Sequence, residues 1–197
     1  MKSILPESSA LFYTNSHLLM EFTVESNKER FLGNYIEELA KNDVYILLIT
    51  QEGNSSYYLQ NFSDFHIIVI ELTVLESSSS NFEFQKFGQI PMNENKILFS
   101  INNVLHELKD KTVLIIFDSI SDIILWLDFN VAYKFMRKAI SNLRRDKTVS
   151  SFFLINKRSH SEQILAAFES LFDGVIVTDA VNECQAKGVI KYRYISY

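Results

Sequence analysis

Residues 112–122 read "TVLIIFDSISD", and this stretch decides the fold class of the chain. Consecutive apolar residues run from Val113 to Phe117 and are followed at once by Asp118. A continuous apolar run of this kind is typical of a β-strand that is buried on both faces, as in a parallel sheet. Ligands of open α/β sheets bind beyond the carboxyl ends of the strands, so Asp118 stands where a functional acid would lie.

Similar apolar runs alternate with amphipathic segments along the rest of the chain. The apolar runs predict strands at 18–24, 44–50, 65–72, 112–117, 150–156 and 175–179. Apolar residues at helical spacing predict helices at 26–42, 93–110, 130–145 and 161–172. This alternation indicates an α/β three-layer sandwich, a mostly parallel sheet with helices on both faces. The alternating pattern of residues 189–196 adds an antiparallel strand at the C-terminal edge.

The composition predicts a single domain spanning residues 1–197. The net charge of −5 gives the molecule no overall attraction for nucleic acid, so any basic site must be local. Because Cys184 is the only cysteine, an internal disulfide is excluded. The four histidines are widely separated and lack the spacing of metal ligands, so no bound metal is expected. No run is long enough for a membrane span and no export signal stands out, which predicts a cytoplasmic protein. A Ser run before Gly88 predicts a mobile loop over residues 76–91, with a structured flap as the alternative.

The first strand-to-helix junction, "TVESNKERF" at residues 23–31, is the natural place for a phosphate site. It contains no glycine and is too short for a phosphate-binding loop. Ser26 and Glu29 instead match a capping box, in which Ser26 accepts an amide hydrogen bond and Glu29 reaches back to the Ser26 amide. Lys28 is the one residue that could contact a phosphate; a lone Lys in a first turn is more often solvated.

The ordered set of segments resembles the RecA-like superfamily, and within it the archaeal KaiC-like and RadA-like ATPases. The resemblance covers roughly residues 10–195. It rests on "LLMEFTVESNKERFLGNYIEEL", "YILLITQEG", "TVLIIFDSIS", "NVAYKFMRKAISNLRRDKTVSSFFLIN" and "LFDGVIVTD". The third of these looks like a Walker B strand. The phosphate-loop signature GxxxxGK[ST] of the family is absent from the chain.

The resemblance implies roles for five residues. Asp118 would be the acid associated with Mg²⁺, with Ser119 as its neighbour, and Glu52 would orient the attacking water. Ser26 and Lys28 would lie where the family binds phosphate, with ATP and Mg²⁺ as cofactors. The structural alternative is that Asp118 and Asp122 end a strand and cap turns, and that Glu52 lies in a turn. Without the phosphate loop, we expect no cofactor.

Two surfaces are candidates for contacts with partners. The predicted helix 130–145 contains no acid and carries five cations: Lys134, Arg137, Lys138, Arg144 and Arg145. These cations could contact DNA phosphates or an acidic partner. The alternative is an ordinary solvated helix face. The stretch "IILWLDF" at residues 123–129 contains Trp126, the only tryptophan. If Ile124, Trp126 and Phe129 were exposed they would form an adhesive patch; core packing is the alternative. Tyrosines of the tail "KYRYISY" could border a free sheet edge.

These observations favour a non-catalytic RecA/KaiC-like domain that acts through protein–protein contacts. It would be a regulatory or assembly subunit, either homo-oligomeric or paired with a related ATPase. Two alternatives remain open. One is a weak ATP-binding protein or ATPase that uses Asp118, Glu52 and backbone amides; the other is a DNA-binding recombination accessory protein that uses the basic helix.

Overall fold

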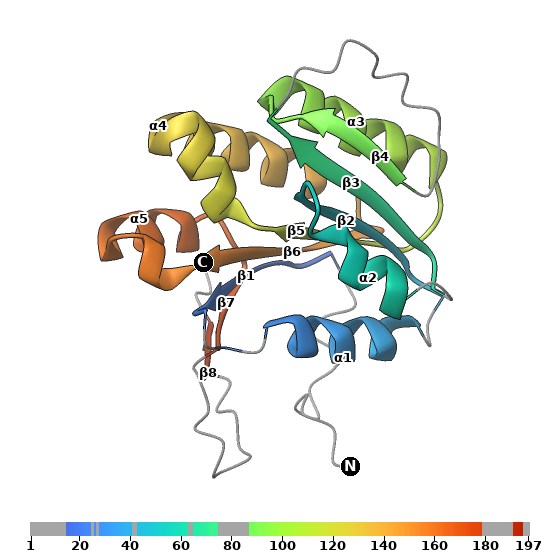
Figure 1. Ribbon diagram of the computed structural model, residues 1–197, viewed down its shortest axis with the longest axis horizontal. Helices are drawn as coiled ribbons and strands as arrows, with labels where there is room; N and C mark the ends of the chain where they lie inside the picture. Colours follow the sequence, from blue (N-terminus) through green and yellow to red (C-terminus); the bar gives the residue numbers. More distant parts are fainter. Residues whose placement is uncertain are drawn as a thin grey trace.

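A single eight-stranded sheet forms the centre of the molecule, in the order β4-β3-β2-β5-β6-β1-β7-β8 (Figure 1). This is a computed structural model, and it describes residues 15–24, 26, 28–40, 43–62, 65–74, 87–178 and 191–194. The strands are β1 (His17–Phe22), β2 (Tyr45–Gln51), β3 (Ile67–Thr73), β4 (Phe87–Pro91), β5 (Val113–Asp118), β6 (Val149–Asn156), β7 (Gly174–Val177) and β8 (Lys191–Tyr194). The helices are α1 (Lys28–Ala40), α2 (Ser55–Asn61), α3 (Glu94–Glu107), α4 (Ile120–Leu143) and α5 (Glu162–Glu169).

Every pair of neighbouring strands from β4 to β7 is parallel, and β8 pairs antiparallel with β7. Parallel neighbours need crossover connections, and the helices provide them for most strands. The predicted α/β class, the mostly parallel sheet and the antiparallel C-terminal strand are therefore confirmed.

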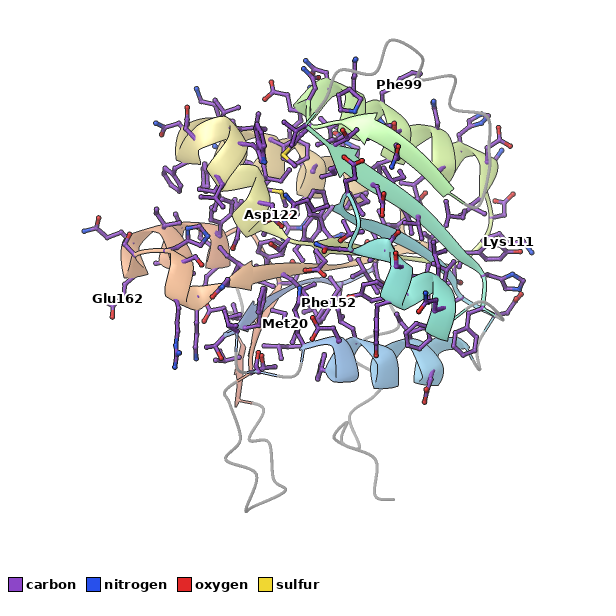
Figure 2. The ribbon with its side chains drawn as sticks, in the orientation of Figure 1. Met20, Phe99, Lys111, Asp122, Phe152 and Glu162 are labelled. Atoms are coloured by element: carbon purple, nitrogen blue, oxygen red, sulfur yellow. The ribbon has the colours of Figure 1, made fainter. Side chains whose placement is uncertain are left out.

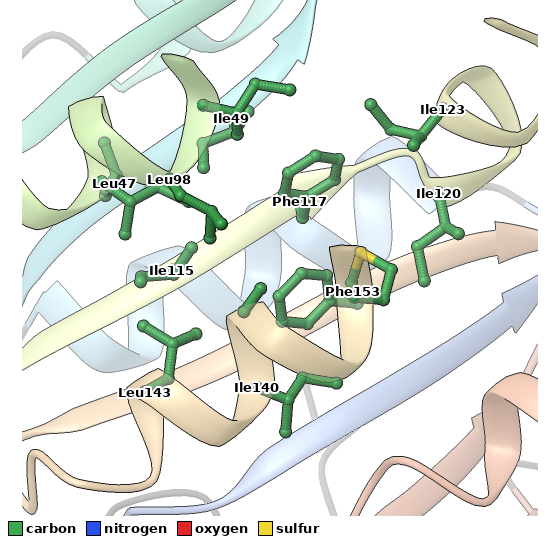
Figure 3. Packing of buried hydrophobic residues seen from close by; sticks show 14 of the residues in the cluster. Leu47, Ile49, Leu98, Ile115, Phe117, Ile120, Ile123, Ile140, Leu143 and Phe153 are labelled. Atoms are coloured by element: carbon green, nitrogen blue, oxygen red, sulfur yellow. The ribbon is translucent and has the colours of Figure 1, made fainter. Parts of the chain in front are cut away.

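Helices cover both faces of the sheet. One hydrophobic cluster joins one face to α1 and α2, and Figure 2 labels two of its members, Met20 and Phe152, on the side of α1. A larger cluster joins the opposite face to α3, α4 and α5. Figure 3 shows part of this second cluster, where the stacked rings of Phe117 and Phe153, with centroids 5.4 Å apart, lie under α4. The central strands are apolar on both sides because both sides are covered.

Three elements differ from the sequence expectations. Helix α4 begins at Ile120 rather than at residue 130, and Asp128 interrupts it with a φ of 62° and a ψ of 166°. Helix α2 was not predicted at all. Strand β4 lies inside the segment that was expected to be a mobile loop, so that expectation is wrong for residues 87–91.

Some expectations fall on residues that are not described. The remainder of the predicted loop, up to residue 86, lies outside the described residues, as do Cys184 and the side chains of the C-terminal tyrosines. Among the helices that are described, none combines the length and the apolar character needed to cross a membrane.

Candidate functional site

The carboxyl ends of β1, β6 and β5 form the part of the sheet edge where a ligand site is expected. Helix α1 leaves β1 and covers one face, whereas α5 follows β6 and covers the other, so the chain changes faces between two adjacent strands. Crevices at such points hold the ligands of open α/β sheets. Two charged residues of the sequence analysis are positioned here, Lys28 at the start of α1 and Asp118 at the end of β5.

Lys28 and Asp118 form an ion pair across the end of β6. The Lys28 ammonium donates to Oδ1 of Asp118 at 2.7 Å and to Oδ2 at 3.0 Å. The side chains are 20% and 5% exposed, respectively. The same ammonium lies 4.8 Å from the centroid of the Phe22 ring, which favours a cation. Lys28 is thus paired and only partly exposed, and both oxygens of Asp118 are occupied by a cation of the chain itself.

A tyrosine of α2, on the same face of the sheet as α1, also contacts this pair. The Tyr58 hydroxyl, from α2, donates to Oδ2 of Asp118 at 3.4 Å. Burial raises the pKa of the Asp118 carboxyl above its ordinary value, while the Lys28 ammonium favours the ionised form and opposes the rise. Burial, with the nearby Asp118, also raises the pKa of Tyr58 far above its ordinary value, so the phenol stays protonated and remains a donor.

Two buried hydroxyls near this pair have no hydrogen-bond partner among the described residues. Thr50, the partner of Asp118 in the β2–β5 register, leaves its Oγ1 unsatisfied, and so does Thr23, just after β1. Buried polar groups usually find a protein or water partner. Water or a ligand atom could serve these two hydroxyls.

A second buried acid, Glu71, lies near the carboxyl end of β3, at the neighbouring part of the same sheet edge. Its Oε1 accepts hydrogen bonds from the Gly53 amide at 3.1 Å, the Ser55 amide at 3.4 Å and the Ser55 hydroxyl. Its Oε2 accepts from Gln89 of β4 at 3.1 Å. Burial opposes ionisation, but the bonds from Ser55, Gln89 and Gly53 outweigh it and hold the pKa of Glu71 below its ordinary value. The carboxylate therefore ties the start of α2 to β3 and β4.

Replacing Glu71 with Gln is expected to lower the free energy of unfolding by roughly 1–3 kcal/mol, because a glutamine keeps only one acceptor oxygen for these donors. The folded-state pKa of Glu71 is depressed, so its contribution is present at neutral pH and is lost as the pH falls through that pKa. Urea unfolding at several pH values measures both effects. The matched control is Glu52→Gln at the exposed neighbour, for which no loss is expected. Equal stability of the two variants would contradict the role of Glu71.

Solved structures share this arrangement of strands and helices. A KaiC-like protein from the hyperthermophilic archaeon Pyrococcus horikoshii OT3 superposes with a TM-score of 0.65 at 16% identity, over 99% of this chain and 88% of that chain. The chain has a RecA-like fold. A further P. horikoshii OT3 protein, solved in a structural study, superposes with a TM-score of 0.62 at 14% identity, over 92% of this chain and 88% of that one. No family model matches the sequence, and no curated protein matches it.

The capping box predicted at the start of α1 is wrong. The Ser26 hydroxyl turns back to Thr23, accepting from its amide at 3.1 Å and donating to its carbonyl oxygen at 2.7 Å. The Ser26 amide also donates to the Thr23 carbonyl oxygen, at 3.0 Å, rather than to Glu29. The junction of this RecA-like fold is thus closed by a tight turn that precedes the helix. A capping box does exist at α4, where Asp122 Oδ2 accepts from the Ser119 amide at 3.2 Å and the Ser119 hydroxyl at 2.9 Å.

Glu52 does not join the Lys28–Asp118 pair in the described contacts. It is exposed after β2, and its amide donates to the Leu72 carbonyl oxygen at 3.0 Å. Besides Asp118, a buried acid at this edge of the RecA-like fold is Glu71, which the sequence analysis missed. An acid near the end of the apolar run 65–72 was the available signal, because such a residue must find donors if the strand is buried.

A serine–histidine contact was also missed. His160 Nε2 lies 2.9 Å from Ser121 Oγ, which also accepts from the Asn156 amide at 2.9 Å. Burial lowers the pKa of His160. Ser121 itself is buried, so this contact ties the start of α4 to the end of β6 and offers no open nucleophile. Within the described residues, no three His, Cys, Asp or Glu side chains form a group that could hold a metal ion.

The two predicted partner surfaces are only partly formed as expected. Arg144 and Arg145 follow the last residue of α4, and Arg144 pairs with Asp173 at 2.6 Å, so the basic stripe on the helix consists of Lys134, Arg137 and Lys138. Trp126 is exposed as the patch hypothesis required. Its expected neighbours Ile124 and Phe129 instead pack against the core, and the exposed neighbour is Leu125.

Proposed function

We propose that this RecA-like domain does not hydrolyse nucleotide and acts through contacts with other proteins. It is a regulatory or assembly subunit, self-associated or paired with a related ATPase. The observation that carries the proposal is the ion pair in which Lys28 occupies both oxygens of Asp118. In a phosphate-loop enzyme, the lysine would bind phosphate and the acid would hold Mg²⁺. Here each group neutralises the other.

The surroundings of the pair also disfavour a triphosphate. The junction before α1 has no glycine, so its backbone is poorly suited to wrap a phosphate. Its amides at Ser26 and Lys28 already donate to the Thr23 and Ser26 carbonyl oxygens. Glu29 lies in the first turn of α1 and adds negative charge where an anion would need attraction. A nucleotide would have to displace these contacts before any chemistry.

Exposed apolar side chains support protein contacts at the same edge. Among the exposed large apolar side chains of the described residues, Val24 and Val74 directly follow β1 and β3, and Leu125 and Trp126 lie in the first segment of α4, which follows β5. Apolar groups concentrated on one side of a protein often mark an interaction site. We therefore infer that the contact region lies at this edge, around the Lys28–Asp118 pair.

Calorimetric titration with Mg-ATP tests the proposal. We expect no binding heat at micromolar concentrations, because the cation and the acid that would bind the ligand hold each other. Micromolar binding that is abolished in Asp118→Ala would overturn the proposal. It would establish the second candidate, a weak ATP-binding protein, which the unsatisfied hydroxyls of Thr23 and Thr50 favour. Binding that survives Asp118→Ala would place a nucleotide elsewhere on the chain.

A further inference from the structure

Helix α4 exposes a surface that combines apolar and basic side chains. We define the α4 surface as Leu125, Trp126, Lys134, Arg137 and Lys138, all of which are exposed. The first two are 79% and 48% exposed, respectively. The helix lies in the outer layer of the molecule, with α3 and α5 in the same layer (Figure 1). Its inner side packs on the sheet, and among the described residues nothing covers these five side chains.

The kink at Asp128 divides this surface into an apolar part and a basic part. Asp128 Oδ1 accepts hydrogen bonds from the amides of Asn130 at 2.7 Å and Val131 at 3.2 Å, so it caps the second segment of α4. Leu125 and Trp126 belong to the first segment, and the three cations belong to the second. The carboxylate of Asp128 is used within the helix, where negative charge at a helix start is favourable.

The three cations have no acid of the chain as a partner among the described residues. The sequence from residue 129 to residue 145 contains no Asp or Glu. The nearby acid Asp173 is already bonded to Arg144, at 2.6 Å. Glu162 and Glu169 of α5 form no ion pair with this surface within the described contacts. In a chain of net charge −5, these three cations form a local excess of positive charge.

We propose that the α4 surface binds an acidic, amphipathic segment of a partner protein. An apolar side chain of that segment packs on Leu125 and Trp126, and its carboxylates face Lys134, Arg137 and Lys138. Exposed ion pairs add little affinity, so the apolar contact supplies most of the binding energy and the charges set orientation and specificity. Two exposed apolar side chains and three cations on the same helix suit such a segment better than a nucleic acid backbone, which needs no apolar anchor. The inference rests on the proposed function only in assuming that the domain acts through protein contacts.

Selection from an unbiased peptide library displayed on phage, with the full chain as the target, tests this inference. We expect the enriched peptides to contain several Asp or Glu residues and at least one large apolar residue. A synthetic copy of one such peptide should shift the fluorescence of Trp126 to shorter wavelength, since it is the only tryptophan and would lose water on binding. Trp126→Ala should weaken binding by about tenfold or more. Charge reversal of Lys134, Arg137 and Lys138 to Glu should reduce it as strongly, and more at low salt than at high salt.

The matched control is Lys147→Glu, an exposed cation outside the α4 surface, which should change affinity by less than about twofold. Circular dichroism confirms that each variant is folded. The inference is wrong if no peptide is enriched, if the enriched peptides lack acids, or if they bind the charge-reversed variant equally well. Salt-dependent binding of duplex DNA that requires the three cations would identify a nucleic acid as the occupant instead. A concentration-dependent Trp126 shift without any peptide would identify a second copy of the chain. None of these outcomes bears on the Mg-ATP titration, so the two proposals fail separately.

Discussion

Replacing Lys28 with Met should lower the free energy of unfolding by about 3–5 kcal/mol, which is typical when one partner of a buried ion pair is removed. The reason is that Asp118 is nearly inaccessible to water and would lose the ammonium that contacts both of its oxygens. Equilibrium unfolding in urea measures the loss. Because the unpaired carboxyl would have a further raised pKa in the folded state, stability of the variant should fall as the pH rises through the ordinary range of a carboxyl group.

Two further variants isolate the ion pair from other effects. Lys134→Met removes an exposed cation from α4 and should leave stability nearly unchanged. The double variant Lys28→Met with Asp118→Leu removes both charges and should recover much of the lost stability, because no buried charge is left unpaired. A double variant that is as unstable as Lys28→Met would mean that the packing of the lysine stem matters and the pair does not.

The second large effect is expected from His17. Its ring is buried, Nδ1 lies 2.7 Å from Ser151 Oγ, and Nε2 has no partner among the described residues. Burial lowers the pKa of His17 from 6.5 to about 4, which Asp173 partly opposes and Arg144 reinforces. As the pH falls below 6.5, the unfolded chain therefore binds a proton at this histidine, whereas the folded chain does not bind it until about pH 4. The free energy of unfolding should therefore decrease by about 3 kcal/mol as the pH falls from 6.5 to about 4. Below that window this group should cause no further decrease.

Stability curves against pH for wild type, His17→Asn and His66→Gln measure this effect. His17→Asn should lack the loss between pH 6.5 and 4 that the wild type shows, whatever its stability at neutral pH. His66→Gln should retain it, because the His66 side chain is 58% exposed. Parallel curves for wild type and His17→Asn would contradict the assignment of this titration to His17.

The strands were predictable wherever burial on both faces produced a continuous apolar run. Residues 113–118 and 149–156 form strands almost as predicted for this reason. Strand β4, "FGQIP", was missed because its Gly and Pro are typical of loops. Helix α2 has only seven residues, too few for a helical period to stand out. The start of α4 was missed because Asp128 breaks the periodicity that the rest of the helix follows.

The residues of the candidate site could be found one at a time, but their contacts could not. Lys28 and Asp118 were both singled out, yet they are 90 positions apart in the chain. Their pairing depends on β6 lying between β1 and β5, which the order of elements in the sequence does not reveal. The Ser26 turn was missed because S-x-x-E describes a common helix start equally well, and only the backbone after β1 decides between the two.

The most direct test of the role of the Lys28–Asp118 pair is a crystal structure determined from crystals grown with millimolar Mg²⁺ and a non-hydrolysable ATP analogue. We expect Lys28 Nζ to remain on both oxygens of Asp118, with no nucleotide against residues 26–29. A phosphate bound to Lys28, or a magnesium ion at Asp118 with the lysine displaced, would contradict the proposal that this RecA-like domain is not an ATPase.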